Sequence, residues 1–341
     1  MTINSTSRMR SRSSVIMDGA DRAPARAMLR AVGLNDRELE QPFVGVPNLG
    51  SDVTPCNAHL SSICEAVMQG VRSASGTPFQ FGTMTVSDAV SMGTQGMKAS
   101  LVSREVIADS IELVSFAEGF DGLVTVAGCD KNLPGTLMAI ARLNIPAVFV
   151  YGGTILPGKY QGRDLSIQDV FEAVGAFSKG SISSQELRNV ECAACPGAGS
   201  CAGMFTANTM SSSIEALGMA LPGDASIPAV DGRKRQMAHM AGEKVLELME
   251  RGIRPSDIIT KESIENAITV VAAMGGSTNA VLHFLAIAKE AGVPFTIEEF
   301  DTVSSRTPYI ADMKPGGRYL MADLDRVGGV PFVMKLLLDA G

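Results

Sequence analysis

Short apolar runs of strand length alternate along the chain with longer segments in which apolar positions recur at helical spacing. The clearest case is the apolar run 122–128, the helical segment 136–143 and the apolar run 145–153. A strand, a helix and a second strand within about thirty residues form a βαβ unit, which joins parallel strands. We therefore predict an α/β fold, layered α/β/α, with a largely parallel sheet.

Proline positions and helical spacing predict the other elements. The segment 41–49 is extended, and Pro42 and Pro47 restrict it to a sheet edge or a loop, because proline cannot donate a ladder hydrogen bond. Asn57 is a candidate cap for a helix that runs to residue 72. Further helices are predicted over residues 24–32, 103–116, 167–179, 183–190, 204–217, 233–251, 258–268 and 330–338.

Composition narrows the class of protein. Apolar residues make up 45% of the chain and charged residues 19%, which is typical of a folded globular protein. The net charge is −7 and the chain lacks a sustained basic stretch, so we expect no nucleic-acid partner. Since no apolar run approaches the roughly 18 residues of a membrane span, we expect no membrane association.

Residues 1–20 are predicted to be a flexible arm, with arginines among serines and threonines. This arm lacks the apolar stretch of a secretory signal. We therefore expect a cytoplasmic protein whose six cysteines are reduced thiols or metal ligands rather than disulfides.

Candidate chemistry begins at Cys129, Asp130 and Lys131, which follow the predicted strand 122–128. Open α/β sheets bind ligands at the carboxyl ends of their strands. A thiolate suits a soft metal and a carboxylate suits a hard one, so this tripeptide combines donors for two kinds of metal. A polar turn that happens to hold a cysteine is the alternative.

Two further cysteines share the setting of Cys129, because Cys56 and Cys201 also lie in loops just before predicted helices. The three are 73 and 72 residues apart, whereas a zinc ribbon or a compact ferredoxin loop has closely spaced ligands. If the three thiolates converge, they would hold an iron–sulfur cluster with one iron short of a protein ligand. Such an iron can act as a Lewis acid.

Other motifs carry weaker signals. Residues 153–160 fit the phosphate-binding pattern G-x-x-x-x-G-K, but Tyr160 stands where a Ser or Thr should be, so a phosphate-binding protein is disfavoured. Cys192 and Cys195 form half of a zinc site without a second close pair, and Cys64 fits a buried helix face. The glycine turn and helix over residues 272–281 suit either a bound carboxylate or tight packing.

Several motifs together resemble a known family. They are Thr-Pro-Cys-Asn at residues 54–57, Ser-Asp at 87–88, Gly-Cys-Asp-Lys-Asn-Leu-Pro-Gly at 128–135, a stretch from Pro196 to Met210, and Asp-Arg-Ala-Pro-Ala-Arg at 21–26. From about residue 11 to its last residue, the chain resembles the amino-terminal part of the dihydroxy-acid dehydratases, in the group that includes phosphogluconate and sugar-acid dehydratases.

The resemblance implies two sets of ligands. The iron–sulfur ligands would be Cys56, Cys129 and Cys201, for a [2Fe–2S] cluster or, alternatively, a [4Fe–4S] cluster. The Mg²⁺ ligands would be Asp88, Asp130 and Lys131, with Lys131 carrying a carbamate. A carbamate turns a cationic side chain into an anionic oxygen ligand, which is what Mg²⁺ prefers.

The resemblance also implies an activity. It is the dehydration of 2,3-dihydroxy-3-methyl carboxylic acids to 2-oxo acids in valine and isoleucine biosynthesis, with both metals as Lewis acids and no net redox change. The partner would be a small dihydroxy acid, and the protein a homodimer. The alternatives are a sugar-acid (aldonate) dehydratase of the same family and a non-catalytic iron–sulfur protein, for which Asp88 and Lys131 would serve no purpose.

The resemblance suggests how the chain is divided. Residues 21–225 would be the α/β region that binds the cluster and Mg²⁺, and residues 226–341 a second α/β or helical region. The family's carboxy-terminal β-rich domain, with a further Mg²⁺ ligand and the serine that abstracts the proton, is absent from these 341 residues. We therefore expect that they cannot turn over substrate by themselves.

Overall fold

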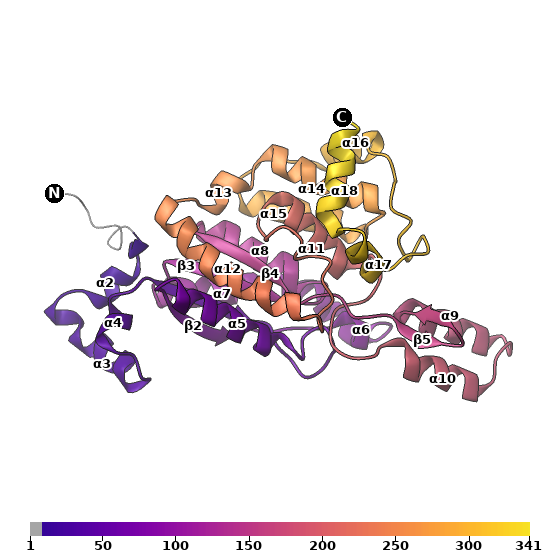
Figure 1. Ribbon diagram of the computed structural model, residues 1–341, viewed down its shortest axis with the longest axis horizontal. Coiled ribbons are helices and arrows are strands. Elements are labelled where there is room, and N and C mark those ends of the chain that lie inside the picture. Colours follow the sequence, from indigo (N-terminus) through magenta and orange to yellow (C-terminus); the bar gives the residue numbers. More distant parts are fainter. Residues whose placement is uncertain (1–8) are drawn as a thin grey trace.

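A four-stranded parallel sheet lies at the centre of the computed structural model, which describes residues 9–341. The spatial order of the strands is β2-β1-β3-β4, and every neighbouring pair is parallel. The strands are β1 (Phe43–Asn48), β2 (Thr77–Gly82), β3 (Gly122–Ala127) and β4 (Ala147–Tyr151). The predicted α/β class and parallel sheet are confirmed (Figure 1).

Helices cover both faces of this sheet, because the strand order reverses direction between β1 and β3. Right-handed crossovers then place α5 (Leu60–Ser73) on one face, and α7 (Lys98–Ala117) and α8 (Asn132–Leu143) on the other. The long helix α12 (Gly232–Arg251) packs along α5 and against β3 and β4. Ligands bind at such a reversal of strand order, at the carboxyl ends of the strands.

Strand β1 corrects one prediction from the sequence, since its prolines indicated an edge or a loop. It lies inside the sheet, between β2 and β3. The strand aligns with β3 at Val44, Gly45 and Asn48 and skips Pro47, while Pro47 aligns with Phe81 of β2. The missing N–H of proline therefore interrupts one ladder near its end and leaves the other intact.

A lobe built from a hairpin and two helices lies at the opposite end of the molecule from the N-terminal helices (Figure 1). Its elements are β5 (Gly158–Tyr160), β6 (Arg163–Leu165), α9 (Ile167–Ser178) and α10 (Ser184–Ala194). Strand β5 pairs antiparallel with β6, so the G-x-x-x-x-G-K stretch ends in a hairpin. A phosphate-binding loop would instead lead into a helix.

The remaining helices pack as a second layer around α11 (Thr206–Leu217), which contacts α8, α14, α15 and α18. Met204, Met274 and Val330 belong to a separate apolar cluster there. The helices are α13 (Pro255–Ile258), α14 (Lys261–Met274), α15 (Asn279–Glu290), α16 (Ile297–Arg306), α17 (Met321–Arg326) and α18 (Gly329–Asp339).

The N-terminal segment is partly packed against the body. Residues 1–8 of the predicted arm lie outside the described residues. Within the rest, α2 (Ser13–Met17) has Met17 in the main apolar core, and the backbone N–H of Ser13 donates to Asp121 Oδ1 at 3.0 Å. Apolar and hydrogen-bonded contacts therefore hold a stretch that its composition predicts to be flexible. Helices α3 (Ala23–Ala31) and α4 (Asp36–Leu39) follow.

Among residues 9–341, none of the helices combines the length and the hydrophobicity that a bilayer crossing needs.

Candidate metal centre

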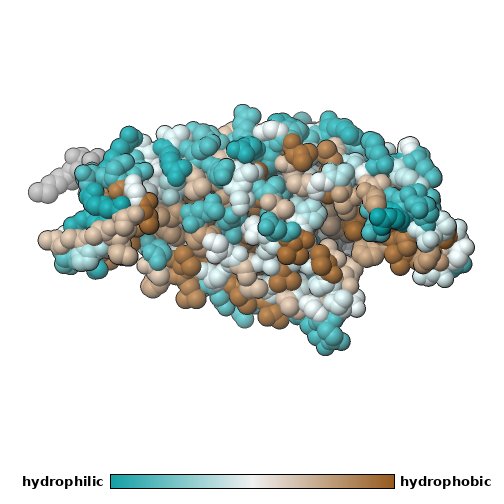
Figure 2. Space-filling view, turned by 90° about the horizontal axis from the view of Figure 1, so that it is seen from below, coloured by the Kyte–Doolittle hydropathy of each residue, from teal (hydrophilic) through white to brown (hydrophobic). Residues whose placement is uncertain are grey.

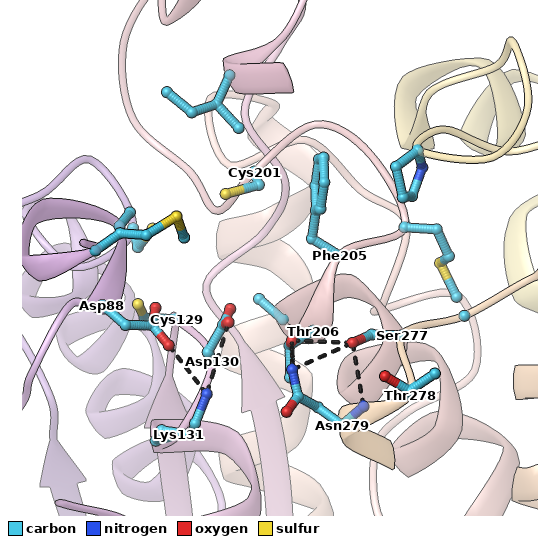
Figure 3. A pocket seen from close by; sticks show the side chains of 18 of the residues that line it. Asp88, Cys129, Asp130, Lys131, Cys201, Phe205, Thr206, Ser277, Thr278 and Asn279 are labelled. Atoms are coloured by element: carbon cyan, nitrogen blue, oxygen red, sulfur yellow. Dashed lines mark hydrogen bonds and ion pairs between the residues drawn. The ribbon is translucent and has the colours of Figure 1, made fainter. Parts of the chain in front are cut away.

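A cavity of about 530 Å³ opens at the carboxyl edge of the sheet (Figure 3). It lies where the loops after β1 and β3 meet the beginnings of α11 and α15. Its lining includes all six residues that the family motifs single out, namely Cys56, Asp88, Cys129, Asp130, Lys131 and Cys201. The structure thus brings together side chains that are up to 145 positions apart.

Cys56 and Cys129 approach each other because their loops follow the neighbouring strands β1 and β3. Both thiols are buried and line the same cavity, where Cys129 Sγ donates to Ser87 Oγ at 3.6 Å. Gly128 permits this approach, since a Cβ atom there would lie 2.2 Å from the carbonyl oxygen of Cys56. Asn57 does not cap α5, which begins at Leu60; its amide instead donates to the Leu49 carbonyl at 2.9 Å and stabilises the Cys56 loop.

The third loop, which carries Cys201, is tied by its backbone to the Cys56 loop and to the loop after β4. The N–H of Gly199 donates to the carbonyl of Pro55 at 2.8 Å, and the N–H of Ser200 donates to that of Gly153 at 2.9 Å. Gly199 has a φ of 124° and a Cβ atom there would lie 2.4 Å from the backbone nitrogen of Ile155, so only glycine fits this contact.

Hard donors lie beside the thiols. One ligand atom from each of Asp88, Cys129 and Asp130 lies within 4.8 Å of the other two. The Lys131 ammonium donates to Asp88 Oδ2 at 2.9 Å and lies 3.8 Å from Asp130 Oδ2 (Figure 3). Ser100 Oγ also donates to Asp88, at 3.0 Å. The tripeptide at the end of β3 therefore meets a second carboxylate, from the start of α6 (Asp88–Ser91).

Burial shifts the proton affinities of this site. The pKa of Asp130 rises to about 6, first because the carboxyl is desolvated and then because Asp88 is close. The pKa of Cys56 is raised by the neighbouring Cys129 thiol and by burial, and the pKa of Cys201 is raised by burial. Without a cation, the thiols of Cys56 and Cys201 favour their protonated forms. A bound metal would displace such protons, so the donor set suits metal ions.

The opposite wall of the cavity is polar. Asn279 Nδ2 donates to Thr206 Oγ1 at 2.8 Å, and the hydroxyls of Thr206 and Ser277 are 3.2 Å apart (Figure 3). The sequence leaves two interpretations of the glycine turn before α15 open: a carboxylate site or a packing turn. The structure places this turn on the cavity, with Gly276 packed against Thr209.

An apolar part of the lining was not predicted from the sequence. It is formed by Ile167 and Phe171 of α9 together with Phe205, Met92 and Met97. These side chains come from segments up to 113 positions apart, and no local motif links them. Only the packing of the lobe beside the sheet brings them to the same cavity.

The remaining cysteines lie elsewhere. Cys64 is fully buried on α5, where burial raises its pKa to about 12, as expected for a structural thiol. Cys192 and Cys195, near the end of α10, are exposed. His283 is buried in α15, and burial lowers its pKa to about 3.

Comparison with known proteins is consistent with this arrangement. The family model described as "Dihydroxy-acid/6-phosphogluconate dehydratase N-terminal" matches residues 41–341. The chain is 57% identical over 333 residues to dihydroxy-acid dehydratase 2 of Staphylococcus saprophyticus, covering 98% of this chain. It is 57% identical over 331 residues to dihydroxy-acid dehydratase of Natronomonas pharaonis, and 55% identical over 330 residues to that of Thermosynechococcus vestitus, each time covering 97% of this chain.

The fold and the cavity define a class of protein: an α/β protein with a site of thiols and carboxylates at the ends of its strands. The chain belongs to the dihydroxy-acid/6-phosphogluconate dehydratase family and corresponds to the family's N-terminal part. It spans 59%, 56% and 59% of the lengths of these three relatives.

Proposed function

We propose that this chain forms the metal-binding part of a dehydratase that converts 2,3-dihydroxy-3-methyl carboxylic acids to 2-oxo acids, a step of valine and isoleucine biosynthesis. One observation carries the proposal: three thiols and a lysine–carboxylate cluster from distant segments line a single cavity. The names of the similar proteins support the substrate class.

Two groups of side chains would hold the cofactors. Cys56, Cys129 and Cys201 would bind a [2Fe–2S] cluster, with [4Fe–4S] as the alternative. Asp88, Asp130 and Lys131 would bind Mg²⁺. When bound, the cluster and Mg²⁺ would supply two Lewis acids for the substrate's hydroxyl and carboxylate oxygens.

Lys131 is suited to modification by its neighbours. Its ammonium balances the charge of Asp88 and Asp130, and its side chain is 8% exposed. A divalent cation would take over that charge balance and release the amine from its ion pairs. After the ammonium loses one proton to solvent, the neutral amine can add CO₂ and lose a second proton, which would give a carbamate among the oxygen donors.

The lining of the cavity favours a branched alkyl acid. Ile167, Phe171 and Phe205 offer an apolar surface for methyl groups, whereas Thr206 and Asn279 on the polar wall can orient oxygens. A polyhydroxylated sugar acid would leave hydroxyl groups against the apolar side chains, at a desolvation cost. An aldonate dehydratase therefore remains the second candidate, supported by the polar wall alone.

The surface supports assembly into the homodimer that we also propose. Apolar side chains gather in several places on the face seen in Figure 2, and the exposed apolar side chains among the described residues include Met28, Phe116 and Phe171. Large exposed apolar patches commonly mark interfaces between proteins.

The decisive experiment measures iron and sulfide in anaerobically prepared protein, together with its visible absorption spectrum. We expect about two irons per chain. Cys129→Ser should remove them, and Cys192→Ser, which changes an exposed thiol on α10, should retain them. Wild-type protein that takes up no iron under these conditions would overturn the proposal.

A further inference from the structure

Behind the cavity lie three polar side chains with no solvent exposure: Tyr151, Ser200 and Asn208. None of them belongs to the proposed ligand sets. Tyr151 ends β4, Ser200 precedes Cys201, and Asn208 lies in the first turn of α11. Burying three polar groups together is costly unless each is hydrogen-bonded. Their partners show what they do.

Two sets of hydrogen bonds position the Cys201 loop. The N–H of Cys129 donates to Ser200 Oγ at 3.3 Å, and because Ser200 directly precedes Cys201, this bond joins the Cys129 loop to the Cys201 loop. The Tyr151 hydroxyl donates to Asn208 Oδ1 at 2.7 Å. Tyr151 ends β4, which pairs with β3, the strand that leads to Cys129.

The second set reaches the Cys201 loop through the amide of Asn208. Its Nδ2 donates to the carbonyl oxygen of Cys201 and, at 2.6 Å, to that of Gly203. Backbone carbonyls can only accept, so the amide nitrogen must face them and Oδ1 must face Tyr151. The orientation of Asn208 is therefore fixed from both sides.

Tyr151 is itself held firmly in place. Its backbone N–H donates to Asp224 Oδ2 at 2.8 Å. The Lys234 ammonium lies 5.5 Å from the centre of the Tyr151 ring and pairs with Asp224 Oδ1 at 2.7 Å. Lys234 has no solvent exposure and Asp224 is 2% exposed. Because this buried ion pair holds the backbone and the ring of Tyr151, the phenol hydroxyl is also held in one position, from which it donates to Asn208.

We propose that Ser200, Tyr151 and Asn208 are positioning residues that hold the Cys129 and Cys201 loops at a fixed separation, so that the thiols are arranged for iron before it binds. The inference rests on the proposed function, because it concerns the same three cysteines. It adds residues that act through the ligands and touch neither metal nor substrate. Partners of this kind commonly tune metal affinity by about 10- to 100-fold.

Tyr151→Phe in the anaerobically reconstituted chain is the test, because it removes one hydroxyl and keeps the ring. We expect iron release to a chelator to accelerate about tenfold or more, with a shifted reduction potential and visible circular dichroism of the bound iron. Tyr160→Phe is the matched control. It removes a hydroxyl that donates to Glu186 at 2.8 Å in the lobe, and we expect it to leave all three readouts unchanged.

Asn208→Asp provides a second variant of nearly the same shape. A carboxylate cannot donate to the Cys201 carbonyl, so this variant should show the same changes as Tyr151→Phe. If one of the two variants fails to fold, the other still tests the inference. If Tyr151→Phe lowers thermal stability but keeps wild-type iron release, potential and spectrum, the residue is merely structural and the inference is wrong. If wild-type protein binds no iron, the proposed function itself fails.

Discussion

At the scale of single residues, the Lys131 ammonium supplies the positive charge that a bound metal would later provide. Its ammonium bridges Asp88 and Asp130 inside a buried cavity. Two carboxylates so close would repel each other without a cation between them. The lysine therefore offsets this repulsion in the chain, and we propose that it forms the carbamate once a metal replaces its charge.

Lys131→Arg tests this dual role. Arginine keeps the positive charge between the carboxylates but cannot form the carbamate. We expect Mn²⁺ binding, measured by electron paramagnetic resonance as a probe of the Mg²⁺ site, to weaken about tenfold or more. In wild-type protein, labelled bicarbonate should produce a carbon-13 carbamate signal. This signal should be absent in Lys131→Arg.

Lys159→Arg is the control for this substitution. Lys159 also pairs with an aspartate, Asp164, but its side chain is 78% exposed on the β5–β6 hairpin. Wild-type Mn²⁺ affinity in Lys159→Arg, together with weakened affinity in Lys131→Arg, is the expected pattern. Equal Mn²⁺ affinity in Lys131→Arg and wild type would exclude Lys131 as a ligand.

The six residues of the proposed ligand sets were selected from the sequence by their resemblance to family motifs, and the structure places all six around one cavity. Ser200 and Asn208 also lie in a motif, but their roles could not be predicted, since Tyr151 is 57 positions from Asn208 and meets it only in the fold. The apolar wall from α9 was missed for the same reason. Motifs give local chemistry, whereas hydrogen-bond partners and cavity walls depend on packing.

At the scale of elements, helices α5 and α12 cross with almost no side chains between them. A Cβ atom on Gly70 would lie 1.9 Å from the carbonyl oxygen of His239, and one on Gly242 would lie 2.2 Å from that of Val67. These glycines let the two backbones touch. Because α5 follows the Cys56 loop, this close packing also holds one side of the candidate metal centre.

Gly242→Ala should therefore destabilise the protein, by about 1–3 kcal/mol, because the added methyl group forces the helices apart. Gly175→Ala is the matched control. It also changes a glycine within a helix, α9, but its Cβ would meet nothing within 4 Å. We expect this variant to gain about 0.5–1 kcal/mol from helix propensity.

Urea unfolding followed by circular dichroism measures both free energies. A Gly242→Ala variant as stable as wild type would mean that α5 and α12 are not in backbone contact.

The elements were predicted well where a local signal decides them and poorly where the neighbours do. Helix α9 was predicted to within one residue from its apolar spacing. Strand β1 was assigned to an edge, because the sequence shows Pro47 but not that only one ladder is affected. Helix α7 begins at Lys98, five residues before the predicted start at Ser103. Ser103 does not cap the helix, because its hydroxyl donates to the Ser100 carbonyl within the helix.

At the scale of the whole molecule, the proposed metal donors and the polar wall face a cavity that is open to the surface. The chain spans about three fifths of the length of the similar dehydratases. We propose, from the family resemblance, that the proton-abstracting group of the reaction lies outside residues 1–341.

A turnover assay tests this assignment. The 341-residue chain, loaded with iron and Mg²⁺, should convert no 2,3-dihydroxy-3-methylbutanoate. A chain extended to the length of its relatives should convert it, and should convert an aldonate much more slowly because of the apolar wall. Formation of the 2-oxo acid is the measurement. Turnover by the 341-residue chain would show that these residues hold a complete site.

The tie between the Gly199 N–H and the Pro55 carbonyl also bears on how the protein matures. Contacts between segments so far apart in sequence form late, because long loops must close first. The three cysteine loops can therefore meet only after the sheet and its crossover helices are in place. Iron delivered during synthesis would find single thiols with no neighbours. Insertion of the proposed cluster would then follow folding and take place through the mouth of the cavity.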